Sequence, residues 1–453
     1  MLLGFIIAYL VITLLLGLGL SKFIKSSSDY ALAGKRMPVL ITASALFATW
    51  FGSETVMGAS SVFAEKGLIS VIEDPFGAAL CLFLLGAFFA KNLYNLNLIT
   101  MGDFFAKRFG PKAETLAAIF MILSYFTWTS AQLIAFAKIL TLITGLSEPV
   151  GIWLSGLLVF AYTFAGGMLA ITITDFIQTI VIIIGLAFIT CSFVGQAGGL
   201  ETLVLEQPKN FWKFTPANDF KSMMEYINAW LIISLGSIPQ QDVFQRIMSA
   251  KDSKTSVASC YLGGAMYLSI AALPLIIAIA AKKIYPDLHG ESLLITAVMR
   301  QGDTLTQVMF FGALMSAIMS TASGSILAPA TTFAENILKP SLKNVSDKKL
   351  LWLMRASVAI MSLAGILLSF TNSSIYELVG MSSALSLVAL LVPLVAGLWW
   401  KPANEIGATV SMLLGIGVWA IYEFMIPSII PAMLLGLFAS IIGMIAGSKF
   451  KTA

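Results

Sequence analysis

The sequence has 453 residues, of which 58% are hydrophobic and only 11% are charged. Soluble proteins carry about 25% charged residues, so this composition excludes a soluble globular enzyme and indicates an integral membrane protein. The net charge of +4 is then a property of the loops, so we expect the lipid bilayer as a partner and no nucleic acid.

Apolar runs long enough to cross a bilayer, about 20 residues each, predict about 13 membrane-spanning helices. They cover residues 2–22, 39–64, 68–90, 113–144, 149–166, 170–196, 224–247, 255–282, 303–335, 349–370, 375–397, 404–425 and 428–448. We expect the first run to be retained, because it lacks the cationic start and the small-residue cleavage site of a signal peptide.

The loop charges predict the orientation. With the N-terminus outside, the inner loops and tail carry 19 of the 27 Lys and Arg residues, and the outer loops carry 7. An excess of positive charge marks the cytoplasmic side of a membrane protein. We therefore expect a multi-pass protein of the plasma membrane with its N-terminus outside and its C-terminus in the cytoplasm.

The second span has a polar centre formed by Gly52, Ser53 and Glu54. A carboxylate at the bilayer centre costs at least about 2.5 kcal/mol, so Glu54 should face protein, water or a ligand. The Gly-Ser pair makes a helix break cheap, and a broken helix frees carbonyls that hold cations in transporters. The alternative interpretation is a kink at a helix crossing, with Glu54 bonded to a neighbour.

Polar groups also occur in the next two spans. Glu73 and Asp74 precede Pro75 in the third span. For Asp74 we favour an ordinary polar helix start, whereas a cation-binding role and a structural one are both open for Glu73. In the fourth span Trp128 and Gln132 share a helical face. Trp128 is far from both span ends, so it belongs to no interfacial belt, and helix packing and ligand contact are both open for it.

The sixth and seventh spans carry two further signals. Asp175 has Thr172, Thr174 and Gln178 around it, which suits either a hard cation or a capped helix start. Pro239 interrupts the seventh span, because proline removes a backbone hydrogen bond. This is the second interrupted helix, five spans after the first. Paired interruptions in two inverted halves point to a transporter site, although Gly and Pro are also frequent in membrane helices generally.

The ninth span carries hydroxyls on neighbouring faces, at Ser316, Ser320, Thr321 and Ser323. Small residues between them would let another helix approach closely, so helix packing is one interpretation. The other is that these hydroxyls complete a sodium site with the broken second span. The residues alone leave both interpretations open.

Taken together, several stretches resemble the sodium:solute symporter family over essentially the whole chain. The most specific is Tyr162-Thr-x-x-Gly-Gly-Met-x-Ala170 followed by Thr174-Asp-x-x-Gln178, joined by Asp29-Tyr-x-Leu-Ala-Gly34, Pro239-Gln-x-x-x-x-Gln-Arg246 and Ala317-x-x-Ser-Thr321. Within the family the chain is most similar to the high-affinity choline transporter branch, through Ala48-Thr-Trp50, Phe88-Phe-Ala-Lys91, Ile238-Pro239, Phe244-Gln-Arg246 and Ser325-Ile-Leu327.

The resemblance implies an all-α membrane protein with a five-plus-five inverted repeat of the leucine-transporter type. The whole chain would be one transporter domain. A peripheral helix and inner loop would occupy residues 1–37, the two repeats 38–197 and 223–398, and two peripheral helices 403–448.

The resemblance also implies transport coupled to Na⁺ as the co-transported ion. The main sodium site falls on the backbone carbonyls of Ala48, Phe51 and Ala317 and on the side chains of Ser320 and Thr321. A second sodium site, present only in some members, would use Asp175 with Ser316, Ser320 or Ser323.

For the solute, choline-transporting relatives hold the quaternary ammonium in an aromatic cage, at about 0.5–2 kcal/mol per good cation–π contact. Trp50 and Trp128 fall on two cage positions, but Ala78 and Gln240 fall where relatives place further aromatics, which argues against choline itself. Nearby carboxylates would offset that loss for a cationic amine. The predicted solute site comprises Trp50, Glu54, Glu73, Ala78, Trp128 and Gln240.

The resulting prediction is a sodium-coupled symporter that imports a small organic solute, such as an amine or a quaternary ammonium compound. Proton coupling through Glu54 is the nearest alternative, followed by an amino acid or a sugar as the solute. A membrane sensor is more distant, because such modules are usually fused to a signalling domain and this chain ends soon after the last span. We do not expect an enzyme, because no nucleophile triad, metal cluster or phosphate loop occurs and His289 lies in a loop.

Overall fold

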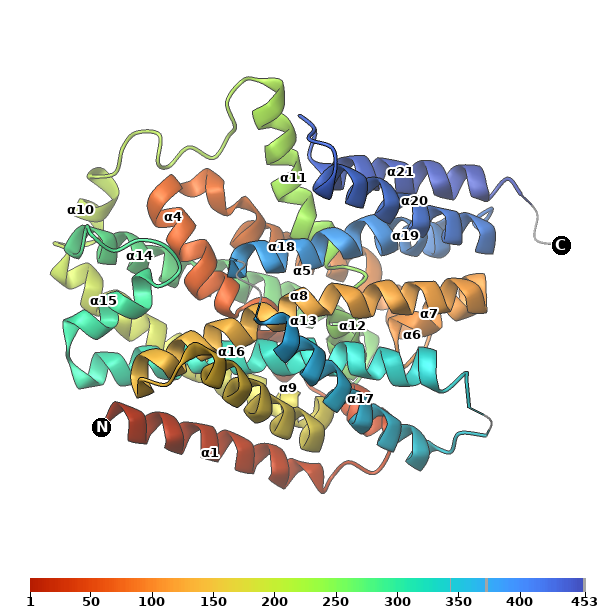
Figure 1. The fold of residues 1–453 in the computed structure, drawn as a ribbon, viewed down its shortest axis with the longest axis horizontal. Helices are drawn as coiled ribbons and strands as arrows, with labels where there is room; N and C mark the ends of the chain where they lie inside the picture. Colours follow the sequence, from red (N-terminus) through yellow and green to blue (C-terminus); the bar gives the residue numbers. More distant parts are fainter. Residues whose placement is uncertain (343, 371–373, 451–453) are drawn as a thin grey trace.

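The computed structural model describes residues 1–342, 344–370 and 374–450. Within these ranges the chain is helical and forms no β-strand (Figure 1), which confirms the prediction of an all-α protein. Helices suit this composition because each one satisfies its own backbone polar groups where apolar surroundings offer no partners. Lys343 and Lys451, two of the predicted inner-side charges, lie outside the described residues.

The longer helices are α1 (Leu2–Ser21), α3 (Val39–Trp50), α8 (Pro111–Thr144), α9 (Glu148–Gln196), α11 (Phe220–Gly236), α13 (Ser253–Ile270), α14 (Ala272–Ile284), α16 (Thr304–Thr332), α17 (Asp347–Leu368), α18 (Ile375–Ser386), α20 (Glu405–Phe424) and α21 (Ala432–Gly447). Shorter helices are α2 (Ser27–Leu32), α4 (Ser60–Lys66), α5 (Ala78–Leu84), α6 (Ala90–Asn95), α7 (Met101–Phe109), α10 (Leu200–Leu205), α12 (Gln241–Ser249), α15 (Leu293–Gln301) and α19 (Val392–Trp399). Turns of 3-10 or π geometry extend or join them at Ala33–Lys35, Glu54–Ala59, Leu68–Val71, Ile72–Gly77, Leu85–Phe89, Phe333–Leu338 and Leu387–Leu391.

The predicted count of 13 spans is not confirmed. By length and composition, nine helices in the described part of the chain are able to cross a membrane, or ten if the bent pair made by α3 and residues 54–66 is one span. The difference has identifiable causes. α9 is a single helix of 49 residues where two spans are predicted. The predicted seventh span is divided into α11 and α12, and α21 has only 16 residues.

α9 changes direction at Gly167, between the two spans predicted there. Its φ of 48° and ψ of −158° lie outside the helical region. A Cβ at this position would lie 2.4 Å from the ring of Tyr30, so both the backbone and the space require glycine. The Tyr30 hydroxyl donates to the carbonyl of Thr163, 3.1 Å away, which ties α2 to this bend.

α16 runs through the centre of the bundle, and its apolar stretch is entirely buried. By contrast, only 17% of the apolar stretch of α1 and 33% of that of α20 is buried. Figure 1 shows α1 along one edge of the molecule and α20 and α21 together at another. Small residues along α16 allow its neighbours to pack closely, which explains its central place.

Two helices are interrupted inside the protein. α3 ends at Trp50 and helix resumes at Glu54, with a bend of 56° between the two halves. α11 ends at Gly236 and α12 begins at Gln241, so Pro239 lies in the gap. The repeat boundaries at 38–197 and 223–398 stay a prediction, and residues 343 and 371–373 of the second repeat lie outside the described ranges.

Candidate ion and solute site

The break after α3 leaves a backbone carbonyl without a helical partner. Phe51 has a ψ of 77°, so the helix cannot continue through it. The Gly52 N–H therefore donates to the Trp50 carbonyl, 2.8 Å away. In a continuing helix it would donate to the Ala48 carbonyl. The Ala48 oxygen is consequently available to groups from other helices.

The Ala48 carbonyl faces two hydroxyls of α16. Ser320 Oγ lies 3.1 Å from it and Thr321 Oγ1 lies 3.2 Å from it. Phe51 and Ala317, whose carbonyls belong to the predicted sodium set, are buried on the same two elements. The structure thus brings three of the five predicted residues into direct contact, and their carbonyl and hydroxyl oxygens are the hard ligands that suit Na⁺.

Polar atoms from three elements converge around Gly52. A Cβ there would lie 2.7 Å from Thr321 Oγ1, 2.7 Å from Glu54 Oε2 and 2.9 Å from Gln132 Oε1. A side chain at this position would therefore enter the space that separates the α16 hydroxyls from the Glu54 carboxylate.

A buried ion pair lies next to these hydroxyls. The Asp175 carboxylate of α9 lies 2.5 Å from Ser320 Oγ and 3.5 Å from Arg246 Nη2 of α12. Arg246 Nε also donates to the carbonyl of Ala45, 2.9 Å away. One guanidinium therefore joins α9, α12 and α3 beside the break in α3.

Of the hydroxyls predicted for a second sodium site, the structure places Ser320 against Asp175, and the site itself stays a prediction. Ser316 Oγ lies 2.6 Å from a tyrosine hydroxyl of α1, and Ser323 Oγ donates to the carbonyl of Ser320 at 2.9 Å. Arg246 supplies the positive charge that a second Na⁺ would bring to Asp175. The sequence did not show this charge partner, because Arg246 comes from a distant helix.

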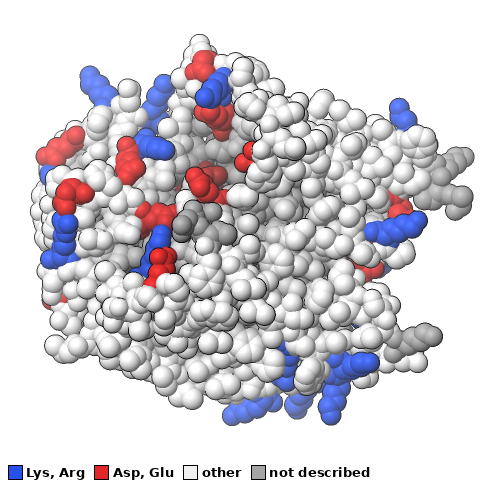
Figure 2. Space-filling view, in the orientation of Figure 1, with Lys and Arg blue, Asp and Glu red and all other residues white. Residues whose placement is uncertain are grey.

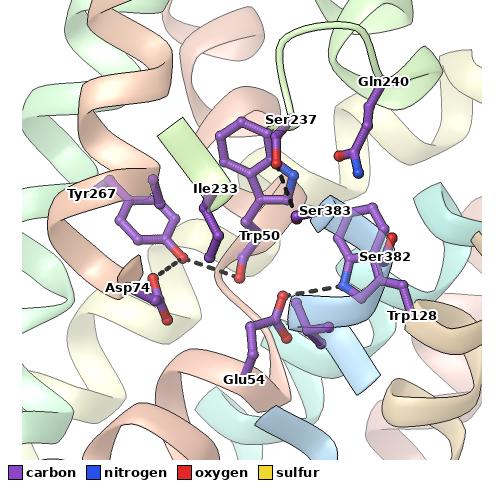
Figure 3. A pocket seen from close by; sticks show the side chains of 12 residues that line it. Trp50, Glu54, Asp74, Trp128, Ile233, Ser237, Gln240, Tyr267, Ser382 and Ser383 are labelled. Carbon is purple, nitrogen blue, oxygen red and sulfur yellow. Dashed lines mark hydrogen bonds between the residues drawn. The ribbon is translucent and has the colours of Figure 1, made fainter. Parts of the chain in front are cut away.

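Glu54 is buried at the start of the second half of the broken helix. One carboxylate oxygen accepts from Trp128 Nε1 at 3.2 Å, and the other accepts from Gln132 Nε2 at 2.7 Å. Figure 3 shows the contact with Trp128. Both donors are neutral, so they satisfy hydrogen bonding at Glu54 without balancing its charge. The shared face of Trp128 and Gln132 predicted from the sequence is the face that holds this carboxylate.

Asp74 is a second buried carboxylate. It lies in the first turn of a helical segment, as the sequence favoured, but its side chain faces the protein interior. It is 1% exposed and accepts from Thr55 Oγ1 at 2.7 Å and from the Tyr267 hydroxyl at 2.8 Å. The Tyr267 hydroxyl also lies 3.1 Å from the Trp50 carbonyl. The only sequence signal for Asp74 was its acidity in a span, and Tyr267 had none.

The two carboxylates face one cavity, shown in Figure 3. Its space is only about 10 Å³, so lining side chains must move to admit an organic solute. Among the described residues that line it there is no Lys, Arg or His. The lining residues are Trp50, Glu54, Asp74, Ala78, Trp128, Ile233, Ser237, Gln240, Tyr267, Val379, Ser382 and Ser383, which include five of the six predicted solute residues.

Glu73, the sixth predicted solute residue, does not line this cavity. It borders a second cavity of about 470 Å³ together with Glu377, Glu423, Tyr376 and Trp419. The side chains of Glu73 and Asp74 face different cavities because the backbone leaves the helical conformation at Asp74, where φ is −142° and ψ is 116°. The role of Glu73 in solute binding stays a prediction, and the sequence did not show the local turn that separates it from Asp74.

A model of the sodium:solute symporter family matches residues 30–415. The chain belongs to the sodium:solute symporter family. High-affinity choline transporter 1 of Drosophila melanogaster is 27% identical over 87% of this chain and 65% of its own length. The human high affinity choline transporter 1 is 27% identical over 91% of this chain and 75% of its own length. The predicted family, and the predicted likeness to its choline transporter branch, are confirmed.

A relative that matches over nearly its full length is the sodium/pantothenate symporter of Haemophilus influenzae, 25% identical over 99% of this chain and 97% of its own. Among solved structures, a Na⁺-coupled sialic acid symporter in a substrate-bound outward-open state matches with a TM-score of 0.88 and 18% identity, over 100% of this chain and 98% of its own. This likeness confirms the predicted fold. The family is one of sodium:solute symporters and these relatives are named as transporters, so the chain is a membrane transporter and not an enzyme.

Proposed function

We propose that the protein is a sodium-coupled symporter of the plasma membrane that imports a small organic cation, an amine or a quaternary ammonium compound. The main evidence that the solute is a cation is that Glu54 and Asp74 line one cavity, with no basic side chain among its described lining residues. Two carboxylates without a balancing charge are costly at membrane depth, and a cationic solute would remove much of that cost.

The aromatic lining supports the same class of solute. Trp50, Trp128 and Tyr267 line the cavity beside the carboxylates. Aromatic faces attract ammonium groups. An anionic solute would instead meet two negative groups and no Lys, Arg or His among the described lining residues. The relatives include transporters named for choline, which is a quaternary ammonium, and others named for pantothenate and proline, so the lining residues must decide the solute.

The second cavity would attract a cationic solute as well, because it too is acidic. Glu73, Glu377 and Glu423 line it, again with no Lys, Arg or His among the described lining residues. Acidic side chains gather around the hollow in the upper middle of the face seen in Figure 2. Clefts lined by one sign of charge concentrate ligands of the opposite sign. This cavity, on the predicted outer side, would therefore raise the local concentration of a cationic solute.

Coupling of sodium to the solute would follow from the break in α3, because the ion site and the solute site both include residues next to it. A sodium ion held by Ala48, Phe51, Ala317, Ser320 and Thr321 would fix the end of α3 against α16. Trp50 and Glu54 flank that same end and line the solute cavity. Binding of the ion therefore shapes the solute site, and the two ligands bind cooperatively. Rocking of the two repeats would then alternate access.

The membrane potential would drive accumulation. Each net positive charge that enters across about 100 mV contributes about 2.3 kcal/mol, which is about 40-fold. A cationic solute carried with one sodium ion would bring in two such charges.

Proton coupling is the second candidate, and one observation favours it. The side-chain donors to Glu54 in the described part of the chain are the neutral Trp128 and Gln132, so a proton is a chemically reasonable partner for it. The hydroxyl and carbonyl oxygens around Ala48 support sodium instead, because a proton carrier needs no such set of oxygens.

The sodium site is tested by replacing Thr321 with alanine. The lost hydroxyl should weaken sodium binding by about 1.5–3 kcal/mol, or about 10- to 150-fold in the sodium concentration needed. We expect the rise in melting temperature of the purified protein in sodium over potassium to shrink accordingly. Thr321→Ser keeps the hydroxyl and should behave like the wild type.

If Thr321→Ala keeps the full sodium response, the proposed ion site is wrong. If the wild-type protein shows no sodium response and its stability or uptake follows pH, proton coupling replaces sodium coupling.

A further inference from the structure

The cavity has two chemically different ends, and this contrast narrows the solute class. We propose that the solute is an ammonium ion with N–H donors and a hydrogen-bond acceptor a few bonds away, as in a protonated amino alcohol, and is not a quaternary ammonium. This inference rests on the proposed function, because it specifies the cation that the same site takes.

The acidic end of the cavity favours a solute with N–H donors. Each carboxylate oxygen of Glu54 and Asp74 accepts one side-chain hydrogen bond, and all four of these donors are neutral. A carboxylate oxygen has capacity for more than one such bond, so each group still has room for a donor from the solute. Hydrogen bonds from an ammonium N–H to a carboxylate are charge-assisted and roughly twice as strong as neutral ones. A quaternary ammonium has no N–H and forgoes them.

The aromatic surface is too small for a full cage. Trp128 stacks on Tyr125, with ring centroids 5.8 Å apart, so one face of its indole is already covered. Its N–H is engaged by Glu54. At two further lining positions the cavity has Ala78 and Gln240, which offer no aromatic face. A quaternary ammonium is bound chiefly through such faces.

The other end of the cavity favours a solute with a hydrogen-bond acceptor. The indole N–H of Trp50 and the hydroxyl of Ser382 are buried and have no hydrogen-bond partner among the described residues. The two side chains are 5% and 2% exposed. An indole N–H can only donate, and leaving it buried without an acceptor is costly. A hydroxyl or ether oxygen on the solute would satisfy it.

The geometry separates the two ends. In the view of Figure 3 the carboxylates of Glu54 and Asp74 lie below the Trp50 indole, and Ser237 and Ser383 lie beside the indole. Those two hydroxyls are 3.3 Å apart and line the same cavity. A short solute would therefore place its ammonium among the carboxylates and its oxygen toward the indole and the hydroxyls.

A methylation series tests the inference directly. The purified full-length protein in sodium is titrated with ethanolamine, N-methylethanolamine, N,N-dimethylethanolamine and choline, and the melting temperature gives an apparent affinity for each. These compounds lose one N–H at a time and keep the hydroxyl. We expect affinity to fall along the series, by at least about tenfold from first to last. Propylamine, which lacks the hydroxyl at similar size, should bind more weakly than ethanolamine.

In the variant Asp74→Asn the affinity should depend less on the number of N–H groups, because the amide removes the charge but keeps the shape of the side chain. Tyr267→Phe provides a second variant if Asp74→Asn does not fold. It removes one donor to Asp74 and leaves the carboxylate freer to accept from the solute. The fall in affinity with each lost N–H should therefore become larger.

The outcomes separate the two proposals. Choline binding as tightly as ethanolamine, or more tightly, overturns this inference and leaves the proposed cation symporter intact. If no member of the series shifts the melting temperature while a neutral sugar or an amino acid does, both the inference and the proposed solute class are overturned.

Discussion

Replacing Gly52 with alanine is expected to lower sodium-dependent uptake by at least about tenfold. The new methyl group would lie 2.7 Å from both Thr321 Oγ1 and Glu54 Oε2. Contacts this short force neighbouring atoms to shift, at a cost of about 1–3 kcal/mol. Because the shifted atoms belong to the proposed ion and solute sites together, the sodium-dependent rise in melting temperature and the solute uptake should fall in parallel.

Gly417→Ala is the matched control. Gly417 lies in the peripheral helix α20, and a Cβ there meets nothing within 4 Å. This substitution should leave uptake unchanged. If Gly52→Ala protein reaches the membrane in normal amounts and keeps wild-type uptake and sodium dependence, the break in α3 is not the ion site.

Replacing Arg246 with alanine is expected to destabilise the protein by about 3–5 kcal/mol, because it leaves a buried carboxylate without its partner. Among the described residues, Arg246 is the only cation within salt-bridge distance of Asp175. The substitution also removes the donor to the Ala45 carbonyl, where α12 is tied to α3. The free energy of unfolding, measured by SDS titration in mixed micelles, should fall accordingly, and uptake should be lost.

A double-mutant cycle distinguishes this pair from general loss of packing. Asp175→Asn removes the charge that Arg246 balances, so adding it to Arg246→Ala should recover about 2 kcal/mol relative to the sum of the single losses. Simple additivity of the two substitutions would contradict the assignment of Asp175 and Arg246 as a coupled pair.

Most of the helical framework was predictable because it follows from apolar runs and from Gly and Pro. The helix break at Gly52 and the gap at Pro239 lie at the residues from which the two interruptions were predicted. The span count was not predictable to the same degree. α9 bends at Gly167 without ending, and α21 is too short to count by length alone, so the number of spans depends on tertiary geometry.

The site was partly predictable for a similar reason. Glu54 and Trp128 stand out because polar or bulky residues at the centre of a span need a partner, and here they are partners of each other. Asp74 was missed because a carboxylate before proline has an ordinary local explanation. The partner that marks it out, Tyr267, lies 193 residues further along the chain.

Charge partners were the hardest feature to foresee. Asp175 sits among hydroxyls in the sequence, which left a cation site and a capped helix start both open, and its carboxylate contacts Arg246 from another helix. Local composition shows that a buried charge needs compensation. It does not show whether an ion, a solute or a distant side chain supplies that compensation.

The central claim is that a sodium gradient drives the uptake of a small organic cation. The most direct test is uptake of radiolabelled ethanolamine and choline, in parallel, into proteoliposomes with an inward sodium gradient and equal pH on both sides. The account predicts accumulation that disappears when potassium replaces sodium and that is reduced by Thr321→Ala. Accumulation driven by a pH gradient in the absence of sodium would contradict it.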